Sequence, residues 1–277
     1  MTGSATATRT SRSWATMLAT PQRSRTARGA AYREAGAGEA VVLVHGVGMR
    51  LEAWEPQVEA LSATHRVIAV DMPGHGESAP LPSGSPLPRF VDWLGAVLDD
   101  LGLDAVNLAG HSMGALIAGG AAATLGPRIR RVALLNGVHR RSPEARAAVM
   151  GRAREIAGGA VDFEGPLRRW FGEGAEDEAA YRLTREWLAG VDPAGYATAY
   201  AAFASGDETY ADAWPRVLCP ALFVTGDGDP NSTPGMAETM AAAAPNGRAA
   251  IIRGHRHMVN LTAPEEVNRL LADWLAR

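Results

Sequence analysis

The segment from Val106 to Ala118 constrains the fold of this chain more than any other. It begins with Val-Asn-Leu-Ala, passes through Gly110-His111-Ser112-Met113-Gly114, and continues in small apolar residues. An apolar strand that meets Gly-x-Ser-x-Gly and turns at once into a helix is the setting of a nucleophile elbow. The two glycines lack a Cβ and leave room for neighbouring backbone at so tight a turn. We therefore predict that Ser112 is a nucleophile held above the edge of a sheet.

Strands and helices alternate on both sides of this segment. The strands are continuous aliphatic and β-branched runs, which are typical of strands buried on both faces. Short loops rich in Gly and Pro join them, and this pattern predicts an α/β fold with a doubly wound, mostly parallel sheet. The predicted strands are 30–34, 41–44, 66–70, 106–109, 132–135, 221–224 and 248–253, and the predicted helices are 51–63, 88–101 and one from Pro264.

The alternation lapses between residues 137 and 214. This stretch has no buried strand, has helical patterns near 143–157, 176–190 and 193–205, and holds ten of the chain's seventeen aromatic residues. We predict a helical cap inserted between two late strands, over the carboxyl ends of the sheet, where ligands bind in open α/β sheets. The predicted domains are an α/β core of residues 29–136 and 215–277 and a cap of residues 137–214.

Residues 1–28 differ in composition from the rest of the chain. They are rich in Ser, Thr, Ala and Arg, and the first acidic residue is Glu34. The apolar patch at residues 14–19 is too short for the core of a signal peptide, although an organelle transit peptide can have this composition. We predict a flexible or docking N-terminal arm on a cytoplasmic protein.

Composition limits the expected partners. A net charge of −3 and a pI near 6.2 give no reason to expect binding to nucleic acid or to an anionic membrane. No apolar run reaches the length of a membrane span. Cys219 is the only cysteine, and we expect it to be a small core residue. No metal or organic cofactor is expected, because the chain lacks zinc-ligand spacing and a dinucleotide-binding glycine motif. The expected partner is a small-molecule acyl substrate, with a homodimer as the candidate assembly.

Two loops after later strands carry an acid and a base. The first contains Asp227 and Asp229, and the second contains His255 and His257. Together with Ser112 they follow the chain order Ser, Asp, His of one class of catalytic triad. A serine hydroxyl needs a base to take its proton, and the imidazole needs a carboxylate to hold its tautomer. The sequence therefore predicts nucleophilic catalysis at the carboxyl edge of the sheet.

Over residues 29–277 the chain resembles the α/β-hydrolase superfamily. The resemblance rests on His45-Gly46, Asp71-x-Pro-Gly-x-Gly-x-Ser78, the elbow, Gly226-x-x-Asp229 and a histidine seven residues before Pro264. It implies that Ser112, Asp229 and His257 form the triad, in preference to Asp227 and His255. It also implies an oxyanion hole made by the backbone N–H groups of Val47 and Met113.

The cap resembles that of 3-oxoadipate enol-lactonases and aminoacrylate-hydrolase-like enzymes. The residues concerned are Arg168-Arg169-Trp170-Phe171-Gly172, the stretch 191–197 and Asp207. The resemblance implies a small carboxylate-bearing lactone or amide as substrate, clamped by a cap arginine. Candidate substrate-binding residues are His45, His111, Trp170, Arg168 and Arg169, with Arg140 and Arg141 as further candidate cations. His45 is also a candidate for supporting the oxyanion loop, and His111 for shaping the pocket beside the elbow.

Three functions are compatible with these features. The leading hypothesis is a serine hydrolase that cleaves a small ester, lactone or related acyl substrate through an acyl-enzyme. An alternative uses the same triad to hydrolyse a carbon–carbon bond in a ring-fission product. A third is a non-catalytic ligand-binding protein with a hydrolase fold, against which the intact triad argues. A serine at position 112 also argues against haloalkane dehalogenases and epoxide hydrolases, which the superfamily builds with an aspartate there.

Overall fold

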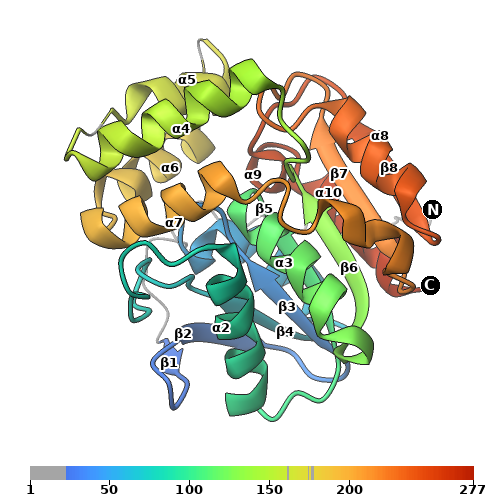
Figure 1. Ribbon diagram of the computed structural model, residues 1–277. Coiled ribbons are helices and arrows are strands. Elements are labelled where there is room, and N and C mark those ends of the chain that lie inside the picture. Colours follow the sequence, from blue (N-terminus) through green and yellow to red (C-terminus); the bar gives the residue numbers. More distant parts are fainter. Residues whose placement is uncertain (1–22, 161, 174, 176–177) are drawn as a thin grey trace, which may run out of the picture.

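The computed structural model describes residues 23–160, 162–173, 175 and 178–277 (Figure 1). Its centre is an eight-stranded sheet in the order β1-β2-β4-β3-β5-β6-β7-β8. Strands β3 to β8 are parallel, while β1 and β2 pair antiparallel at one edge, so the predicted mostly parallel sheet is confirmed. The strands are β1 (Ser24–Arg25), β2 (Ala31–Ala35), β3 (Ala40–Val44), β4 (Arg66–Val70), β5 (Val106–His111), β6 (Ile129–Leu135), β7 (Ala221–Gly226) and β8 (Gly247–Ile252).

The central strands are buried on both faces. In β3 every residue is buried, and its side chains alternate between two apolar cores. Val42 and Val44 join one core, and Val41 and Leu43 join the other. A strand of this kind must be apolar at every position, because both of its faces are covered by helices.

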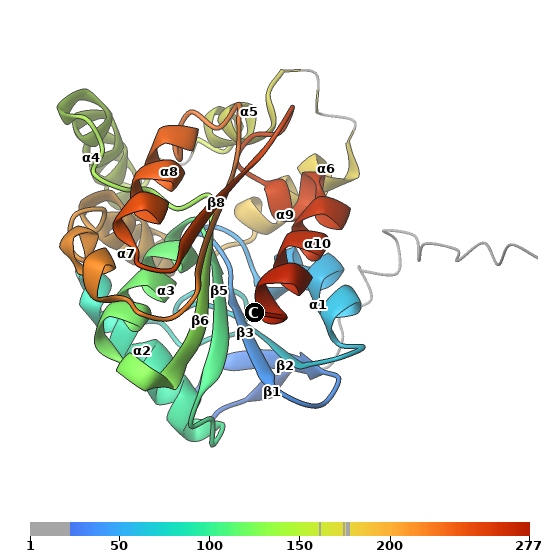
Figure 2. The ribbon, with the colours of Figure 1, turned by 90° about the vertical axis from the view of Figure 1, so that its right-hand side faces the viewer.

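Helices cover both faces of the sheet (Figure 2). One face carries the 3₁₀ turn η2 (Leu51–Trp54), α1 (Glu55–Leu61), α9 (Val259–Thr262) and α10 (Pro264–Leu275). The other carries α2 (Leu87–Asp100), α3 (Met113–Thr124) and α8 (Pro234–Ala243), with 3₁₀ turns η3 (Gly126–Arg128) and η4 (Ala211–Arg216). The helix predicted over 51–63 is therefore a 3₁₀ turn followed by a short α-helix.

Among the described residues between β6 and β7 are the α-helices of the stretch predicted as a cap, which keeps that name here: α4 (Pro143–Ala157), α5 (Glu164–Phe171), α6 (Ala179–Ala189) and α7 (Pro193–Ser205). Figure 1 shows them together at the carboxyl ends of the strands, and α7 contacts α2, α3 and α4. Ser142 and Asp192 cap the N-termini of α4 and α7, and a proline follows each, which is a favourable start for a helix. The helix α5 lies outside the helical ranges predicted from the sequence.

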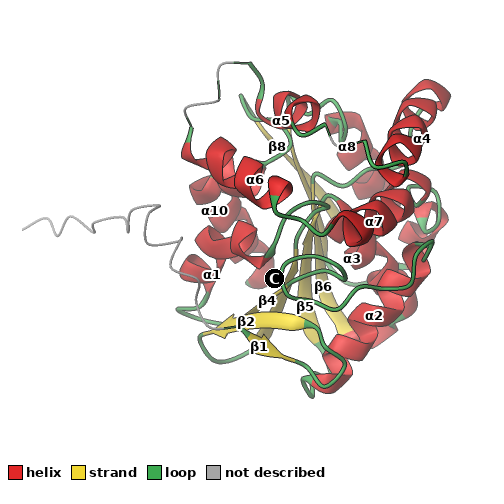
Figure 3. Ribbon diagram, turned by 90° about the vertical axis from the view of Figure 1, so that its left-hand side faces the viewer, coloured by secondary structure: helices red, strands yellow, loops and turns green. Residues whose placement is uncertain are grey.

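The N-terminal segment docks on the core from residue 23 onward. Most of the predicted arm, residues 1–22, lies outside the described residues. In the described part of the arm, Ser24–Arg25 form the edge strand β1, seen beside β2 in Figure 3. In the described part of the chain, no helix is long and apolar enough to cross a membrane.

Candidate active site

Ser112 occupies a strained turn between β5 and α3. Its backbone has φ 55° and ψ −112°, a region that residues other than glycine rarely adopt. A Cβ on Gly110 would lie 2.0 Å from the carbonyl oxygen of Gly114, and one on Gly114 would lie 2.1 Å from that of Val44. Both positions therefore require glycine, and the turn holds Ser112 at the carboxyl edge of the sheet.

Ser112, His257 and Asp229 form one hydrogen-bonded chain. The Ser112 Oγ lies 3.0 Å from Nε2 of His257, and Nδ1 of His257 lies 2.7 Å from Oδ2 of Asp229. All three residues are buried, with 7%, 2% and 3% of their surfaces exposed. Asp229 follows β7 and His257 follows β8, so the parallel sheet brings together residues that are far apart in the chain. Asp227, in contrast, is exposed and accepts a hydrogen bond from the Gly254 N–H.

Asn136 completes the surroundings of the Asp229 carboxylate. Its Nδ2 donates to Oδ2 of Asp229 at 2.8 Å, while the Asn231 N–H donates to Oδ1 at 2.8 Å. Burial by itself would raise the pKa of the Asp229 carboxyl. The adjacent His257 and these donors outweigh burial and hold that pKa below its usual value. Asn136, which was not among the residues predicted for the site, is therefore a hydrogen-bond donor to the triad acid.

Two backbone N–H groups flank the nucleophile. Met113 is the first residue of α3, where N–H groups have no partner within the helix. Val47 lies in the loop after β3, between Gly46, whose carbonyl accepts from Met49, and Gly48, whose N–H donates to Nε2 of His75 at 3.0 Å. Within the described ranges neither the Val47 nor the Met113 N–H has an acceptor. Both therefore remain the candidate donors of the predicted oxyanion hole.

His45 and His111 hydrogen-bond to loops that border the triad. Nδ1–H of His45 donates to the Gly46 carbonyl at 2.8 Å, and Nε2 accepts from the Met72 N–H at 2.9 Å. Nε2–H of His111 donates to the His257 carbonyl at 2.8 Å. Burial lowers the pKa of His45 well below its usual range and that of His111 to about 3. Both rings are therefore neutral, buried supports of the site.

Trp170, on α5, covers the imidazole of the triad. Its indole stacks on His257 with ring centroids 5.8 Å apart and planes 24° apart. Its carbonyl accepts from the His257 N–H at 3.1 Å. Of the three cap residues expected to bind substrate, Trp170 is thus in contact with the triad, while its neighbours Arg168 and Arg169 are exposed.

The other candidate cations are engaged elsewhere. Arg140 forms an ion pair with the exposed Asp212. Arg141 is buried, pairs with Asp207 at 3.1 Å, and lies over the Phe203 ring. These contacts join the two connections between the cap and the core, so they fix the cap in place.

Arg152, on α4, is a cap cation that was not among the predicted site residues. Burial raises the pKa of the Tyr196 and Tyr200 hydroxyls, and the charges of Arg152 and Arg169 lower it in both cases. The Tyr196 ring lies beside Gly48, in the loop of residues 46–51 that follows β3 and is called the oxyanion loop here. Two cap cations therefore act on an aromatic pair that reaches the site.

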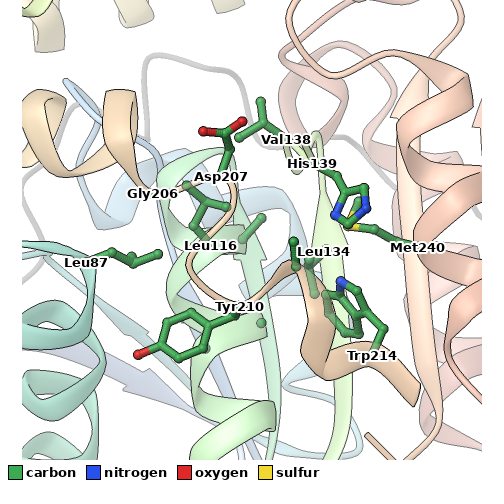
Figure 4. Close-up of a pocket in the computed structure, with 14 residues that line it drawn as sticks. Leu87, Leu116, Leu134, Val138, His139, Gly206, Asp207, Tyr210, Trp214 and Met240 are labelled. Atoms are coloured by element: carbon green, nitrogen blue, oxygen red, sulfur yellow. The ribbon is translucent and has the colours of Figure 1, made fainter. Parts of the chain in front are cut away.

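A separate small pocket lies beside α3 (Figure 4). It has a volume of about 20 Å³, room for about one water molecule. Its walls include Leu116, His139, Tyr210 and Trp214, and no triad residue lines it. Among the described residues, no three His, Cys, Asp or Glu side chains are grouped as metal ligands.

The sequence of residues 41–270 matches the sequence model described as "Alpha/beta hydrolase family". The chain belongs to this family. It is an α/β-hydrolase enzyme, and both the fold and the arrangement of the elbow agree with that membership. The predicted resemblance to the superfamily is confirmed.

Individual relatives narrow the comparison. The chain is 50% identical over 248 residues to the (E)-2-((N-methylformamido)methylene)succinate hydrolase of Acinetobacter baylyi, covering 90% of this chain and 94% of that protein. An enol-lactonase from Burkholderia xenovorans is 27% identical with a TM-score of 0.81, covering 92% and 100%. A malate-bound esterase from Thermogutta terrifontis is 26% identical with a TM-score of 0.83, covering 92% and 98%.

Proposed function

We propose that this α/β hydrolase cleaves a small, carboxylate-bearing acyl compound through a covalent intermediate on Ser112. The observation that carries the proposal is the unbroken hydrogen-bonded chain from Ser112 through His257 to Asp229. It lies beside two backbone N–H groups that have no acceptor among the described residues. A nucleophile, a base, an orienting acid and an oxyanion hole together are the requirements of acyl transfer.

The mechanism follows from these positions. Ser112 Oγ attacks the substrate carbonyl carbon while Nε2 of His257 takes its proton. Asp229 holds the tautomer and stabilises the imidazolium that forms. The Val47 and Met113 N–H groups donate to the oxyanion, each contributing about 3–4 kcal/mol in the transition state.

Attack by Ser112 produces a tetrahedral intermediate. Its collapse breaks the bond to the leaving nitrogen or oxygen, and that atom takes the proton from His257. A water molecule, deprotonated by His257, then attacks the acyl-serine. The second tetrahedral intermediate then collapses, His257 returns the proton to Ser112 Oγ, and the acid is released. Both halves use the same base and the same oxyanion donors, so no further catalytic group is required.

The relatives favour a dicarboxylate substrate. The name of the Acinetobacter relative describes a succinate with two carboxylates and an N-formyl group on an enamine nitrogen. Malate, found in the Thermogutta esterase structure, is also a four-carbon dicarboxylate. We infer that this chain acts on an acyl group, amide or ester, attached to a dicarboxylate of similar size.

Arg169 and Arg152, whose guanidinium also pairs with the exposed Asp162 at 3.1 Å, are the cations proposed to bind the substrate carboxylates, since arginine pairs with carboxylates in bidentate geometry. Their charges reach Tyr196 and Tyr200, and Tyr196 borders the oxyanion loop. Changing either arginine to Gln is expected to raise KM for a dicarboxylate at least tenfold. The same changes should leave hydrolysis of p-nitrophenyl acetate, which has no carboxylate, unchanged.

The deciding experiment is intact-protein mass spectrometry with a fluorophosphonate probe, in wild type and Ser112→Ala, alongside a p-nitrophenyl acetate assay. We expect one adduct and a measurable turnover in wild type, and neither in the variant. Labelling that survives in Ser112→Ala would show that another serine is the nucleophile. A folded wild type with neither adduct nor turnover would favour the ligand-binding alternative.

Hydrolysis of a carbon–carbon bond is the second candidate, because the name of the Acinetobacter relative specifies the substrate but not the bond that is broken. The same triad serves both reactions. Product analysis distinguishes them: release of formate from an N-formyl enamine dicarboxylate indicates acyl–nitrogen cleavage. Cleavage of a vinylogous diketone, with that compound untouched, would favour the carbon–carbon reaction.

A further inference from the structure

A buried ionic cluster lies beneath the oxyanion loop, and its cation comes from the N-terminal segment. Nε of Arg23 donates to Oδ2 of Asp71 at 3.0 Å, and Nη2 donates to both carboxylate oxygens of Glu52 at 2.7 Å. The three side chains are 2%, 0% and 7% exposed, in the order Arg23, Asp71, Glu52. Buried charges are energetically unfavourable unless they are paired, so loss of one member would leave the others destabilised.

Asp71 fastens two loops at once. Its Oδ1 accepts from the Leu51 N–H at 2.8 Å, at the end of the loop after β3. Its Oδ2 accepts from the Glu77 N–H at 3.0 Å, in the loop after β4. A Cβ on Gly76 would lie 2.2 Å from this carboxylate, so the second loop wraps closely around it.

The same two loops are joined around Val47. The Gly48 N–H donates to His75, which belongs to the loop after β4. The Met72 N–H donates in return to His45, at the start of the loop after β3. The position of the Val47 N–H therefore depends on how the two loops sit together, and the Asp71 carboxylate fixes one side of that arrangement.

Arg23 is the cation that permits the carboxylate to be charged there. Burial raises the pKa of Asp71, the charge of Arg23 is the largest influence that opposes this, and the nearby Glu52 adds to the rise. Arg50 also binds Glu52, but it is one-third exposed. Without Arg23, the buried carboxylates of Asp71 and Glu52 would lie close together. The partly exposed Arg50 would then be the cation left to pair with Glu52.

We propose that Arg23 is a positioning residue for the oxyanion hole: it holds the loop of residues 46–51 in the geometry that aims the Val47 N–H at the reacting oxygen. This proposal rests on the proposed acyl-transfer function. The oxyanion exists only in the transition state, so a displaced donor lowers kcat and leaves KM nearly unchanged.

The test is steady-state kinetics of Arg23→Ala with p-nitrophenyl acetate. The matched control is Arg28→Ala, which removes another arginine of the same segment. Arg28 is mostly exposed and pairs with Asp100 on α2, away from the loop. We expect kcat to fall about 100-fold in Arg23→Ala, as for misplacement or loss of one oxyanion donor, with KM within about twofold. Arg28→Ala should match wild type.

Chemical rescue separates positioning from general destabilisation. Millimolar guanidinium, far below denaturing concentrations, should raise the kcat of Arg23→Ala at least tenfold. It should have no effect on the kcat of Arg28→Ala. Arg23→Lys, which keeps the charge but not the fork of donors, should lie between wild type and Arg23→Ala. A wild-type kcat in Arg23→Ala overturns the proposal. The proposal is also overturned if the fractional loss of kcat matches the fraction of enzyme that is unfolded and guanidinium does not reverse it.

Hydrogen exchange keeps the proposal testable even if the proposed function fails. The hydrogen-bonded amides of Gly48, Met49 and Leu51 should exchange at least tenfold faster in Arg23→Ala than in wild type, while amides of β5 and β6 stay protected. If wild type lacks turnover, the acyl-transfer function is refuted, and exchange alone decides whether Arg23 holds this loop. Unchanged protection of residues 46–51 would refute the positioning role.

Discussion

The indole of Trp170 lies nearly parallel to the imidazole of His257, and the Trp170 carbonyl accepts the His257 N–H at 3.1 Å. One cap residue therefore covers the catalytic base with its ring and holds the backbone of that base with its carbonyl. Because the two residues belong to α5 and to the loop after β8, the cap contributes directly to the geometry of the triad.

Replacing Trp170 with Ala should lower kcat/KM about tenfold, because the imidazole loses its aromatic cover and gains access to water. Trp170→Phe keeps an aromatic face and should lose less than threefold. Trp187→Ala is the control, since Trp187 is a half-buried cap tryptophan on α6 without a triad contact. Equal losses at Trp170 and Trp187 would show that cap packing in general, and not the stacked ring, matters.

Asn136→Gly should lower kcat about 10- to 100-fold, because Asp229 loses the amide donor to its Oδ2. Glycine is the appropriate replacement at φ 50°, where Asn136→Ala would add backbone strain of about 1 kcal/mol. Comparing the kcat and stability of the two variants separates the lost hydrogen bonds from the strain. A fully active Asn136→Gly enzyme would contradict this role.

The same variant should show a defined pH dependence of stability. The pKa of Asp229 is lowered in the folded enzyme, so its stabilising contribution is present above the unfolded pKa of about 4 and is lost as the pH falls through the folded value. Removing the donor raises that folded pKa. The difference in unfolding free energy between wild type and Asn136→Gly should therefore be largest near pH 7 and shrink in acid, as denaturant titrations would measure.

Gly114→Ala should destabilise the enzyme by more than about 3 kcal/mol or prevent folding, because its Cβ would collide with the β3 backbone. The control is Gly151→Ala on α4, where a Cβ meets nothing within 4 Å. There alanine should stabilise the helix by about 0.5–1 kcal/mol. Thermal and urea unfolding test both, and comparable effects at the two sites would refute the steric account of the elbow.

Stability should fall as the pH drops from 6.5 to 4, because burial lowers the pKa of His75 to about 4. Above pH 6.5 both states are neutral at this residue; below it the unfolded chain binds a proton that the folded chain refuses until about pH 4. The loss from His75 amounts to roughly 3 kcal/mol across this window. Unfolding titrations of His75→Gln should show a correspondingly shallower dependence, and parallel curves would contradict it.

Much of the fold could be predicted because its signals are local. Continuous apolar runs such as Val41–Val44 mark buried strands wherever they pair, and the Gly-x-Ser-x-Gly turn is decided by contacts among adjacent backbone segments. The helix α5 escaped prediction because Gly165 and Pro166 lie within its eight residues and obscure the helical pattern. Its tertiary contacts, above all the stacking of Trp170, support it.

The sequence by itself determined the order of the elements, the elbow and the set of residues from which a triad could be drawn. The resemblance to the family already favoured Asp229 over Asp227. Only the tertiary structure decided that Asn136 donates to Asp229, that His111 holds the His257 carbonyl, and that Arg23 lies under the oxyanion loop. The reason is physical: a side chain's type is written locally, whereas its partner, its burial and hence its charge state depend on segments far away in the chain. Asp71 shows this most clearly, because its partners Arg23 and Leu51 come from two other segments that meet it only when the sheet has formed.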